Sequence, residues 1–201
     1  MGDDPAPHRW DRLALALLTG AAVAIAVAPL AVADDYSLLT DTTSESGAQG
    51  VSGGWVVRFG FLAFAAAVAR VAWISRHRVG PWVLRGHGAV VGSVIAAAAF
   101  ATRPWRLDAP YDPVEHTLHL IASIGVGAGA AIVAGALATT GWRVDRRIPR
   151  DLIVVVAIGL VAWPMMAVAP EFRGLFQRIM WAVAIIWYAS AAQSSRMAVR
   201  S

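Results

Sequence analysis

Two histidines, His116 and His119, stand near the start of a long apolar run. If this run is helical, the spacing of three places both imidazoles on one face, with Ser123 one turn beyond His119. Imidazole and carboxylate groups are common zinc ligands, and Asp108 and Glu115 are close in sequence. Zinc held with an open position could hydrolyse a lipid-linked ester or amide. A His-x-x-His pair alone is nevertheless a weak motif beside the longer zinc patterns.

A second group with possible chemistry is the loop run Ser44-Glu45-Ser46. A serine there could be a nucleophile served by His116 or His119, if the loop folds over the start of the helix. No nucleophile-elbow pattern surrounds these serines, and serines in polar loops are ordinarily turn formers. The structural interpretation, in which the histidines hydrogen-bond with the outer loops, stays open beside both catalytic ones.

The histidines are positioned by a predicted helix that starts with a clear signal. Asp112 can cap it, Pro113 suits the first helical position, and Glu115 can reach back to the cap. This combination predicts a capping box, so the carboxylates of Asp112 and Glu115 have a structural interpretation as well as a chemical one.

The same predicted helix carries a series of small residues. Gly125 and Gly129 form a small-xxx-small pair, which Ala131 and Gly135 repeat further along. Such pairs let neighbouring helices approach the backbone closely in membranes. We therefore expect Gly125, Gly129 and Gly135 to mark a helix-packing surface.

The composition places the chain in a membrane. Its 201 residues are 58% hydrophobic with a mean hydropathy of +0.59, which is too apolar for a soluble domain of this length. There is no cysteine, which excludes disulfides, thiolate metal sites and cysteine nucleophiles. The net charge of +4 comes from arginines in short clusters between apolar runs, a pattern of membrane topology rather than of nucleic-acid binding.

The apolar runs predict an all-α fold: a polytopic transmembrane bundle of six helices in a single domain, residues 1–201. We read the first run as an uncleaved span, and expect a kink at Pro164 in the fifth. The predicted spans are 13–33, 54–74, 86–102, 115–138, 152–168 and 175–192.

The arginines predict the orientation of this bundle. With six spans both termini share one side, and that side carries most of the arginines, so both termini are expected in the cytoplasm and the protein in the inner (plasma) membrane. The outer loops are acidic instead. The arginines on the terminal side are Arg9, Arg12, Arg76, Arg78, Arg85, Arg143, Arg146, Arg147, Arg150, Arg196 and Arg200, against Arg103, Arg106, Arg173 and Arg178 in the opposite loops.

Charged and polar residues should gather on the outer face. We expect ion pairs between the outer arginines and carboxylates to fix the loops, since interfacial charges usually pair. The predicted polar cluster comprises Glu45, Arg58, Arg106, Asp108, Asp112, Glu115, His116, His119, Glu171 and Arg178.

Two other functions of helical membrane proteins find little support. Haem between helices needs facing histidines, but His77 and His87 are expected on the cytoplasmic side, and the outer pair shares one helix. Ion-coupled transport needs ionisable groups near the midplane, where the sequence offers only hydroxyls such as Ser93.

Three segments resemble a known family: residues 36–50 (YSLLTDTTSESGAQG), the His-bearing start of the fourth span, and residues 173–188 (RGLFQRIMWAVAIIWY). They are similar to the bacterial six-helix membrane family known as domain of unknown function 998, with a remote similarity to DRAM-like membrane proteins. Ser44-Glu45-Ser46-Gly47 resembles the family's Ser-Glu-x-Gly-like loop, whereas Gln177 stands where an acidic residue is expected before Arg178. The resemblance implies the fold but no activity; the DRAM-like similarity hints at lipid-related roles.

The leading hypothesis is a non-catalytic membrane protein, without a cofactor, that binds lipid or serves as an accessory subunit of a larger inner-membrane complex. Its expected partners are membrane lipids and a protein in the membrane, and not nucleic acid. The alternative is an outer-face, zinc-dependent hydrolase that acts on a lipid-linked substrate through His116 and His119.

Overall fold

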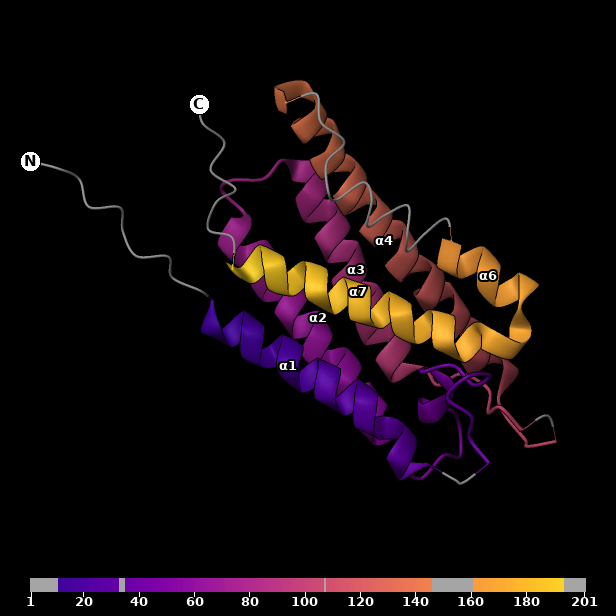
Figure 1. Cartoon of the computed structure of the whole chain (residues 1–201). Coiled ribbons are helices and arrows are strands. Elements are labelled where there is room, and N and C mark those ends of the chain that lie inside the picture. The colour runs from indigo at the N-terminus through magenta and orange to yellow at the C-terminus, as the bar shows by residue number, and fades with distance from the viewer. Residues whose placement is uncertain (1–10, 33–34, 107, 146–160, 194–201) are drawn as a thin grey trace, which may run out of the picture.

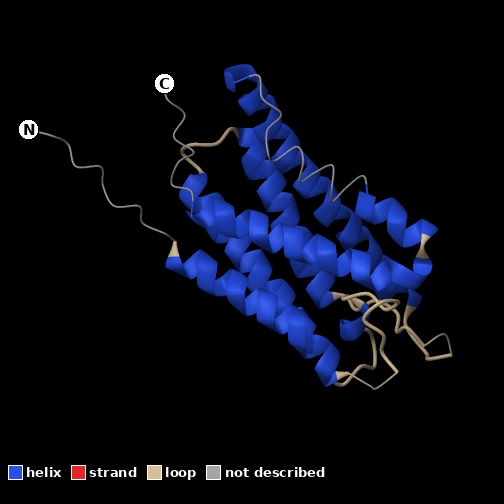
Figure 2. Ribbon diagram, viewed as in Figure 1, coloured by secondary structure: helices blue, strands red, loops and turns tan. Residues whose placement is uncertain are grey.

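The computed structural model describes residues 11–32, 35–106, 108–145 and 161–193, and their side chains except those of residues 140–145. This part of the chain is helical and contains no strand, which confirms the all-α prediction (Figure 2). Five of its helical segments are long and apolar enough to cross a membrane. They are Arg12–Ala31, Trp55–Ser75, Pro81–Ala99, Pro113–Thr139 and Pro170–Ala192.

The first two helices form one side of the bundle. Helix α1 (Arg12–Val27) begins where the Asp11 carboxylate accepts a hydrogen bond from the Ala14 N–H at 2.8 Å, and it continues into the short η1 (Ala28–Ala31). Helix α2 (Trp55–Ser75) lies against it. Gly60 allows this contact, because a Cβ there would stand 3.2 Å from the Ala24 Cβ. The buried apolar face of α1 thus packs directly on α2.

Helices α3 (Pro81–Ala99) and α4 (Pro113–Asp145) form the most extensive helix pair. Helix α3 differs from the predicted span 86–102. Pro81 occupies the first turn after an extended Gly80, which is a favourable helix start, and the helix ends at Ala99.

The last described helices complete the bundle. Helix α6 (Trp163–Val168) leads through η4 (Pro170–Phe172) into α7 (Arg173–Gln193), which packs on α1, α2 and α6 (Figure 1). The predicted fifth span, 152–168, lies largely outside the described residues, and only its end is seen as α6.

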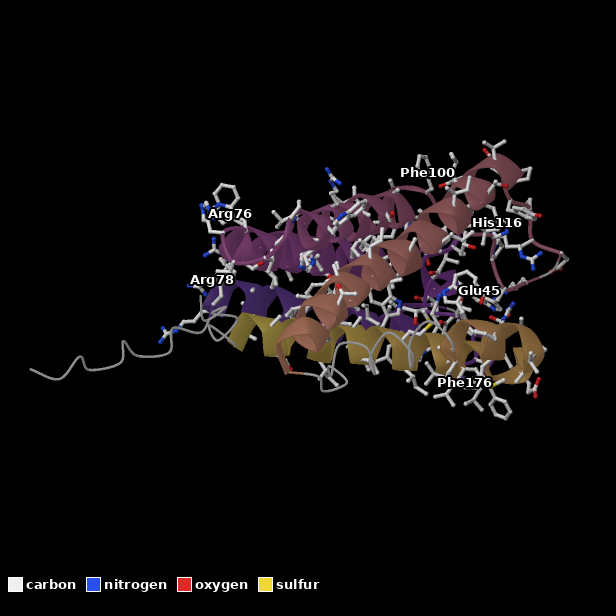
Figure 3. All side chains as sticks on the ribbon, turned by 90° about the horizontal axis from the view of Figure 1, so that it is seen from above. Glu45, Arg76, Arg78, Phe100, His116 and Phe176 are labelled. Carbon is white, nitrogen blue, oxygen red and sulfur yellow. The ribbon has the colours of Figure 1, made fainter. Side chains whose placement is uncertain are left out.

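The connections between helices lie at two opposite ends of the bundle. The segments 35–53, 100–106 and 108–112 gather at one end, which we call the loop end (Figure 1). At the other end the start of α1 meets the end of α7, since the Asp11 N–H donates to the Ala192 carbonyl at 3.3 Å. Figure 3 shows Glu45 and His116 at the loop end, and Arg76 and Arg78 at the far end.

The arginine pattern predicts that the loop end faces outward, and single cysteines can test this because the chain has none. Leu38 and Asp108 are exposed at the loop end, and His77 is exposed in the connection between α2 and α3. We expect L38C and D108C, but not H77C, to react with a membrane-impermeant thiol reagent applied to intact cells. Labelling of H77C alone would reverse the orientation.

Candidate functional site

The loop between α1 and α2 folds back over the bundle and closes its end. We call residues 36–49 the polar cap. Four of its polar residues, Asp41, Thr43, Glu45 and Ser46, are at most 7% exposed. The short η2 (Glu45–Gly47) lies directly on α2, because a Cβ at Gly47 would stand 2.5 Å from a methyl group of Val57. A polar segment this deeply buried must satisfy its groups internally.

Glu45 is at the centre of the cap. Its Oε2 accepts hydrogen bonds from the Thr42 N–H at 2.6 Å and from the Thr42 hydroxyl at 3.0 Å. Its Oε1 pairs with Nη2 of Arg173 at 3.0 Å, while Nε of Arg173 donates to the Thr40 carbonyl at 2.7 Å. Burial raises the pKa of the Glu45 carboxyl above its usual value, although the Thr42 N–H and the Arg173 charge oppose this.

The first turns of α7 hold the other side of the cap. Nη1 of Arg178 donates to the carbonyls of Leu38 and Asp41, each at 2.8 Å, and its Nη2 donates to the Tyr36 hydroxyl at 2.6 Å. That hydroxyl donates in turn to the Thr42 carbonyl at 2.7 Å. Arg178 therefore fixes the cap through oxygens of the backbone and of Tyr36.

Gln177 stands where the family resemblance implies an acidic residue, and its hydrogen bond shows why an amide is tolerated there. Its Oε1 accepts a hydrogen bond from the Ser44 N–H at 3.2 Å. A backbone donor needs only an acceptor oxygen, which a neutral amide supplies. The contact also joins the cap directly to α7.

The remaining charges at the loop end do not form the single cluster that the sequence predicts. Arg58 donates from Nε and Nη2 to the Gly47 carbonyl, at 3.2 and 3.0 Å, rather than to a carboxylate. Arg106 pairs with Asp35 through two bonds of 2.7 Å, but both side chains are half exposed. Asp108 and Glu171 are exposed. Neither forms an ion pair within the described residues.

A glutamine that the sequence analysis missed connects the two segments of the loop end. The Gln49 side chain donates to the carbonyls of Ala101 and Asp112, at 3.1 and 3.0 Å, and accepts from the Asp112 N–H at 2.6 Å. The Gln49 N–H donates to the Thr102 carbonyl at 3.0 Å. No local motif announces this role, because every partner lies more than fifty residues away.

The start of α4 departs in one respect from the predicted capping box. The helix begins at Pro113 rather than at residue 115, and Asp112 Oδ1 caps it by accepting from the Val114 N–H at 2.8 Å. Glu115 does not reach back to the cap residue: its Oε1 accepts from the Ala101 N–H at 2.7 Å. Since Gln49 already accepts from the Asp112 N–H, Glu115 is free to bind the preceding connection.

His116 and His119 have different hydrogen-bond partners. These partners require opposite tautomers of the two rings. The Arg103 N–H donates to Nδ1 of His116 at 3.2 Å, so this nitrogen carries no proton. Nδ1 of His119 lies 2.8 Å from the Phe100 carbonyl and 3.1 Å from the Ala97 carbonyl. Because carbonyl oxygens only accept, this nitrogen must carry the proton. Nε2 of His119 is buried and has no hydrogen-bond partner among the described residues.

The side chains of the two catalytic interpretations are not joined to one another by hydrogen bonds in the described part of the chain. The described residues contain no group of three histidine, aspartate or glutamate side chains that could hold a metal ion. The Ser46 hydroxyl donates to the Thr43 carbonyl at 2.7 Å. Neither His116 nor His119 is hydrogen-bonded to Ser44 or Ser46 in this part of the chain.

Two of the three predicted packing glycines lie where α3 and α4 approach each other. A Cβ at Gly129 would stand 2.8 Å from the Val90 nitrogen, and one at Gly125 would collide with the Ser93 hydroxyl. Gly86, which the sequence analysis missed, faces Val133 in the same way. Gly135 does not mark this contact, because a Cβ there would meet no atom within 4 Å in the part of the chain that the structure describes.

An apolar cavity, partly open, lies beneath the cap between α2, α3, α4, α6 and α7. Ser44, Gln177 and Ser123 contribute polar groups to its wall. Deeper in the bundle, the hydroxyl of Tyr188, which also lines the cavity, lies 3.1 Å from Nδ1 of His87, a residue buried within α3. The other residues that line the cavity are Phe61, Phe64, Val90, Val94, Ala97, Val126, Gly127, Ala130, Trp163, Met166, Met180, Trp181, Ala184 and Trp187.

The long apolar helices and the closed cap define a polytopic helical membrane protein. A family model described as "Protein of unknown function (DUF998)" matches residues 13–194, so the chain belongs to this family and the resemblance drawn from its sequence is confirmed. No curated protein and no solved structure matches the chain.

Proposed function

We propose that this chain is a non-catalytic protein of the inner (plasma) membrane that binds the hydrocarbon chain of a lipid in the cavity beneath the polar cap. The observation that carries the proposal is the cavity wall. It is formed largely by aliphatic and aromatic side chains, while the few hydroxyl and amide groups include Ser44 and Gln177 of the cap contact. Such a surface favours an apolar chain with a polar end.

Aromatic rings form part of this apolar wall. Phe61, Trp181 and Tyr188 all line the cavity. Aromatic side chains offer large apolar surfaces. Sites for small molecules are lined mostly by such side chains and use few polar groups.

The zinc-dependent hydrolase is the weaker proposal. It would use Nε2 of His119 as a zinc ligand, since this nitrogen has no hydrogen-bond partner among the described residues. The other ring nitrogen, Nδ1, contacts a backbone carbonyl. Metal-bound histidines commonly donate their second ring N–H to a carbonyl in this way. Two observations argue against it. Nδ1 of His116 accepts a hydrogen bond from the Arg103 N–H. Among the described residues, no carboxylate completes a group of three possible metal ligands with the two histidines.

Photolabelling can test the proposed function. A phospholipid with a diazirine in its acyl chain should label Met180, which lines the cavity, as well as Ile124, which is exposed on α4. The substitution A130F should fill the cavity and lower labelling at Met180 several-fold, with Ile124 unchanged. Peptide mass spectrometry of the full chain in nanodiscs measures both positions.

The matched control is A131F, which adds the same ring at an exposed position of α4. It should leave both labels at the level of the unsubstituted chain. Labelling of Ile124 without labelling of Met180 in the unsubstituted chain would show that lipid does not enter the cavity, and would reject the proposal.

A further inference from the structure

Gln177 presents an oriented amide at the wall of the cavity. It lines the cavity together with Ser44, whose N–H donates to Oε1 of Gln177 at 3.2 Å. A backbone N–H can only donate, so this contact identifies the oxygen of the amide. The NH₂ group is the other branch of the same planar amide. One branch of the Gln177 side chain is therefore bound to the cap, while the other points away from that contact.

The NH₂ group of Gln177 is a donor that the described residues do not use. No hydrogen bond joins Nε2 to another described residue, and Nε2 is not among the side-chain atoms that are buried without a partner. Nε2 is therefore open to a group from outside the chain. Since an amide NH₂ carries two donor hydrogens, this end of the cavity favours a ligand with an acceptor oxygen.

The rest of the cavity wall favours an uncharged acceptor. No charged side chain lines the cavity within the described part of the chain. The Ser123 hydroxyl already donates to the His119 carbonyl at 2.9 Å, and the Tyr188 hydroxyl lies deeper. The Ser44 hydroxyl is the other possible donor. A carbonyl group suits such a wall, because it needs only donors, whereas a buried charge without a partner is costly.

We propose that Gln177 is a specificity-determining residue, whose NH₂ group binds an ester carbonyl of a membrane glycerolipid. In a glycerolipid the ester carbonyls join the hydrocarbon chains to the glycerol and its headgroup. A chain that fills the apolar part of the cavity therefore places its carbonyl at the cap end, where Gln177 lies. The headgroup stays outside, so the uncharged wall does not have to neutralise it. The inference rests on the proposed function and names the group of the lipid that the site recognises.

A comparison of ester and ether lipids tests the assignment and needs no substituted protein. An ether-linked phospholipid keeps the headgroup and the chains but has no carbonyl. The full chain is placed in nanodiscs of ether-linked phosphatidylcholine with a trace of a diazirine probe, which has either ester or ether links. The ester probe should label Met180 about fivefold more than the ether probe does, which corresponds to about 1 kcal/mol for one net hydrogen bond. The exposed Ile124 should be labelled equally by both probes.

Substitutions then assign the preference to Gln177. Q177M keeps an unbranched side chain but has no N–H to donate, so the two probes should label Met180 equally. The matched control is Q49M, the same change at a glutamine of the loop end that does not line the cavity. It removes hydrogen bonds to Ala101 and Asp112 but leaves the wall of the cavity, and should keep the fivefold preference for the ester probe.

The outcomes separate this inference from the proposed function. Equal labelling of Met180 by both probes in the unsubstituted chain would reject the role of Gln177 and leave the cavity proposal standing. Labelling of Ile124 alone by both probes would reject both proposals. A preference that is lost in S44A but kept in Q177M would assign the carbonyl to the Ser44 hydroxyl instead. Displacement of the ester probe by an isoprenoid quinone, but not by an ester-linked phospholipid, would overturn the assignment to a glycerolipid.

Discussion

Replacement of Glu45 by alanine should lower the free energy of unfolding by about 3 kcal/mol, because removing one partner of a buried ion pair leaves the other partner poorly solvated. Arg173 would lose its nearer carboxylate partner, at 3.0 Å, and keep only Asp41 at 3.8 Å. The Thr42 N–H and hydroxyl would lose an acceptor at 2.6 and 3.0 Å. A thermal melt in detergent should show a fall of roughly 10 °C for a chain of this length.

Two substitutions give the matched comparison. E171A removes a carboxylate of the same kind at an exposed position and should change the melting temperature little. E45Q keeps the shape of Glu45 and an oxygen for Thr42, so it should cost much less than E45A. Equal melting temperatures for E45A and E171A would show that the cap does not depend on its central carboxylate.

The pH dependence of Glu45 has a defined sign. Burial raises its pKa in the folded protein above the usual 4.5, so the folded state retains a proton that the unfolded chain releases. This contribution to stability is complete below pH 4.5 and is lost as the pH rises through the raised pKa. The melting temperature of the unsubstituted chain, relative to that of E45Q, should therefore fall as the pH rises above 4.5.

Local signals in the sequence predicted the helices and some of their ends. Asp112 was identified as a cap because the amide groups it binds lie two and three residues away. Pro81 after Gly80 is a similar local start for α3, which the predicted span 86–102 did not use.

The cap contacts could not be predicted, for a physical reason. Arg58 and Arg178 bind backbone carbonyls, which every residue has and which therefore leave no mark in the sequence. Glu115 satisfies the Ala101 N–H fourteen residues away rather than its own helix start. Gln49 joins two segments in the same manner. Residue types indicated that the loops would be fixed, while only the fold determines which oxygen each donor reaches.

Gly129→Leu should give a large loss of stability, of the order of 3 kcal/mol or more, because it overpacks a contact between two backbones. A Cβ at Gly129 would stand 2.8 Å from the Val90 nitrogen and 3.0 Å from the Gly86 carbonyl oxygen. Neither atom belongs to a flexible side chain. Helices α3 and α4, which form the most extensive helix pair, would therefore have to move apart. The measurements are the yield of monodisperse protein and its melting temperature.

Gly135→Leu is the matched control on the same helix. It changes the same residue type, with the same helix propensity, at a position where a Cβ meets no atom of the described residues within 4 Å. Any gain from replacing a helical glycine is common to both variants, so their difference isolates the α3–α4 contact. G135L should melt close to the unsubstituted chain or slightly above it. If G129L and G135L have the same melting temperature, α3 and α4 do not pack against each other at Gly129. The part of the cavity wall that these two helices form would then have a different arrangement.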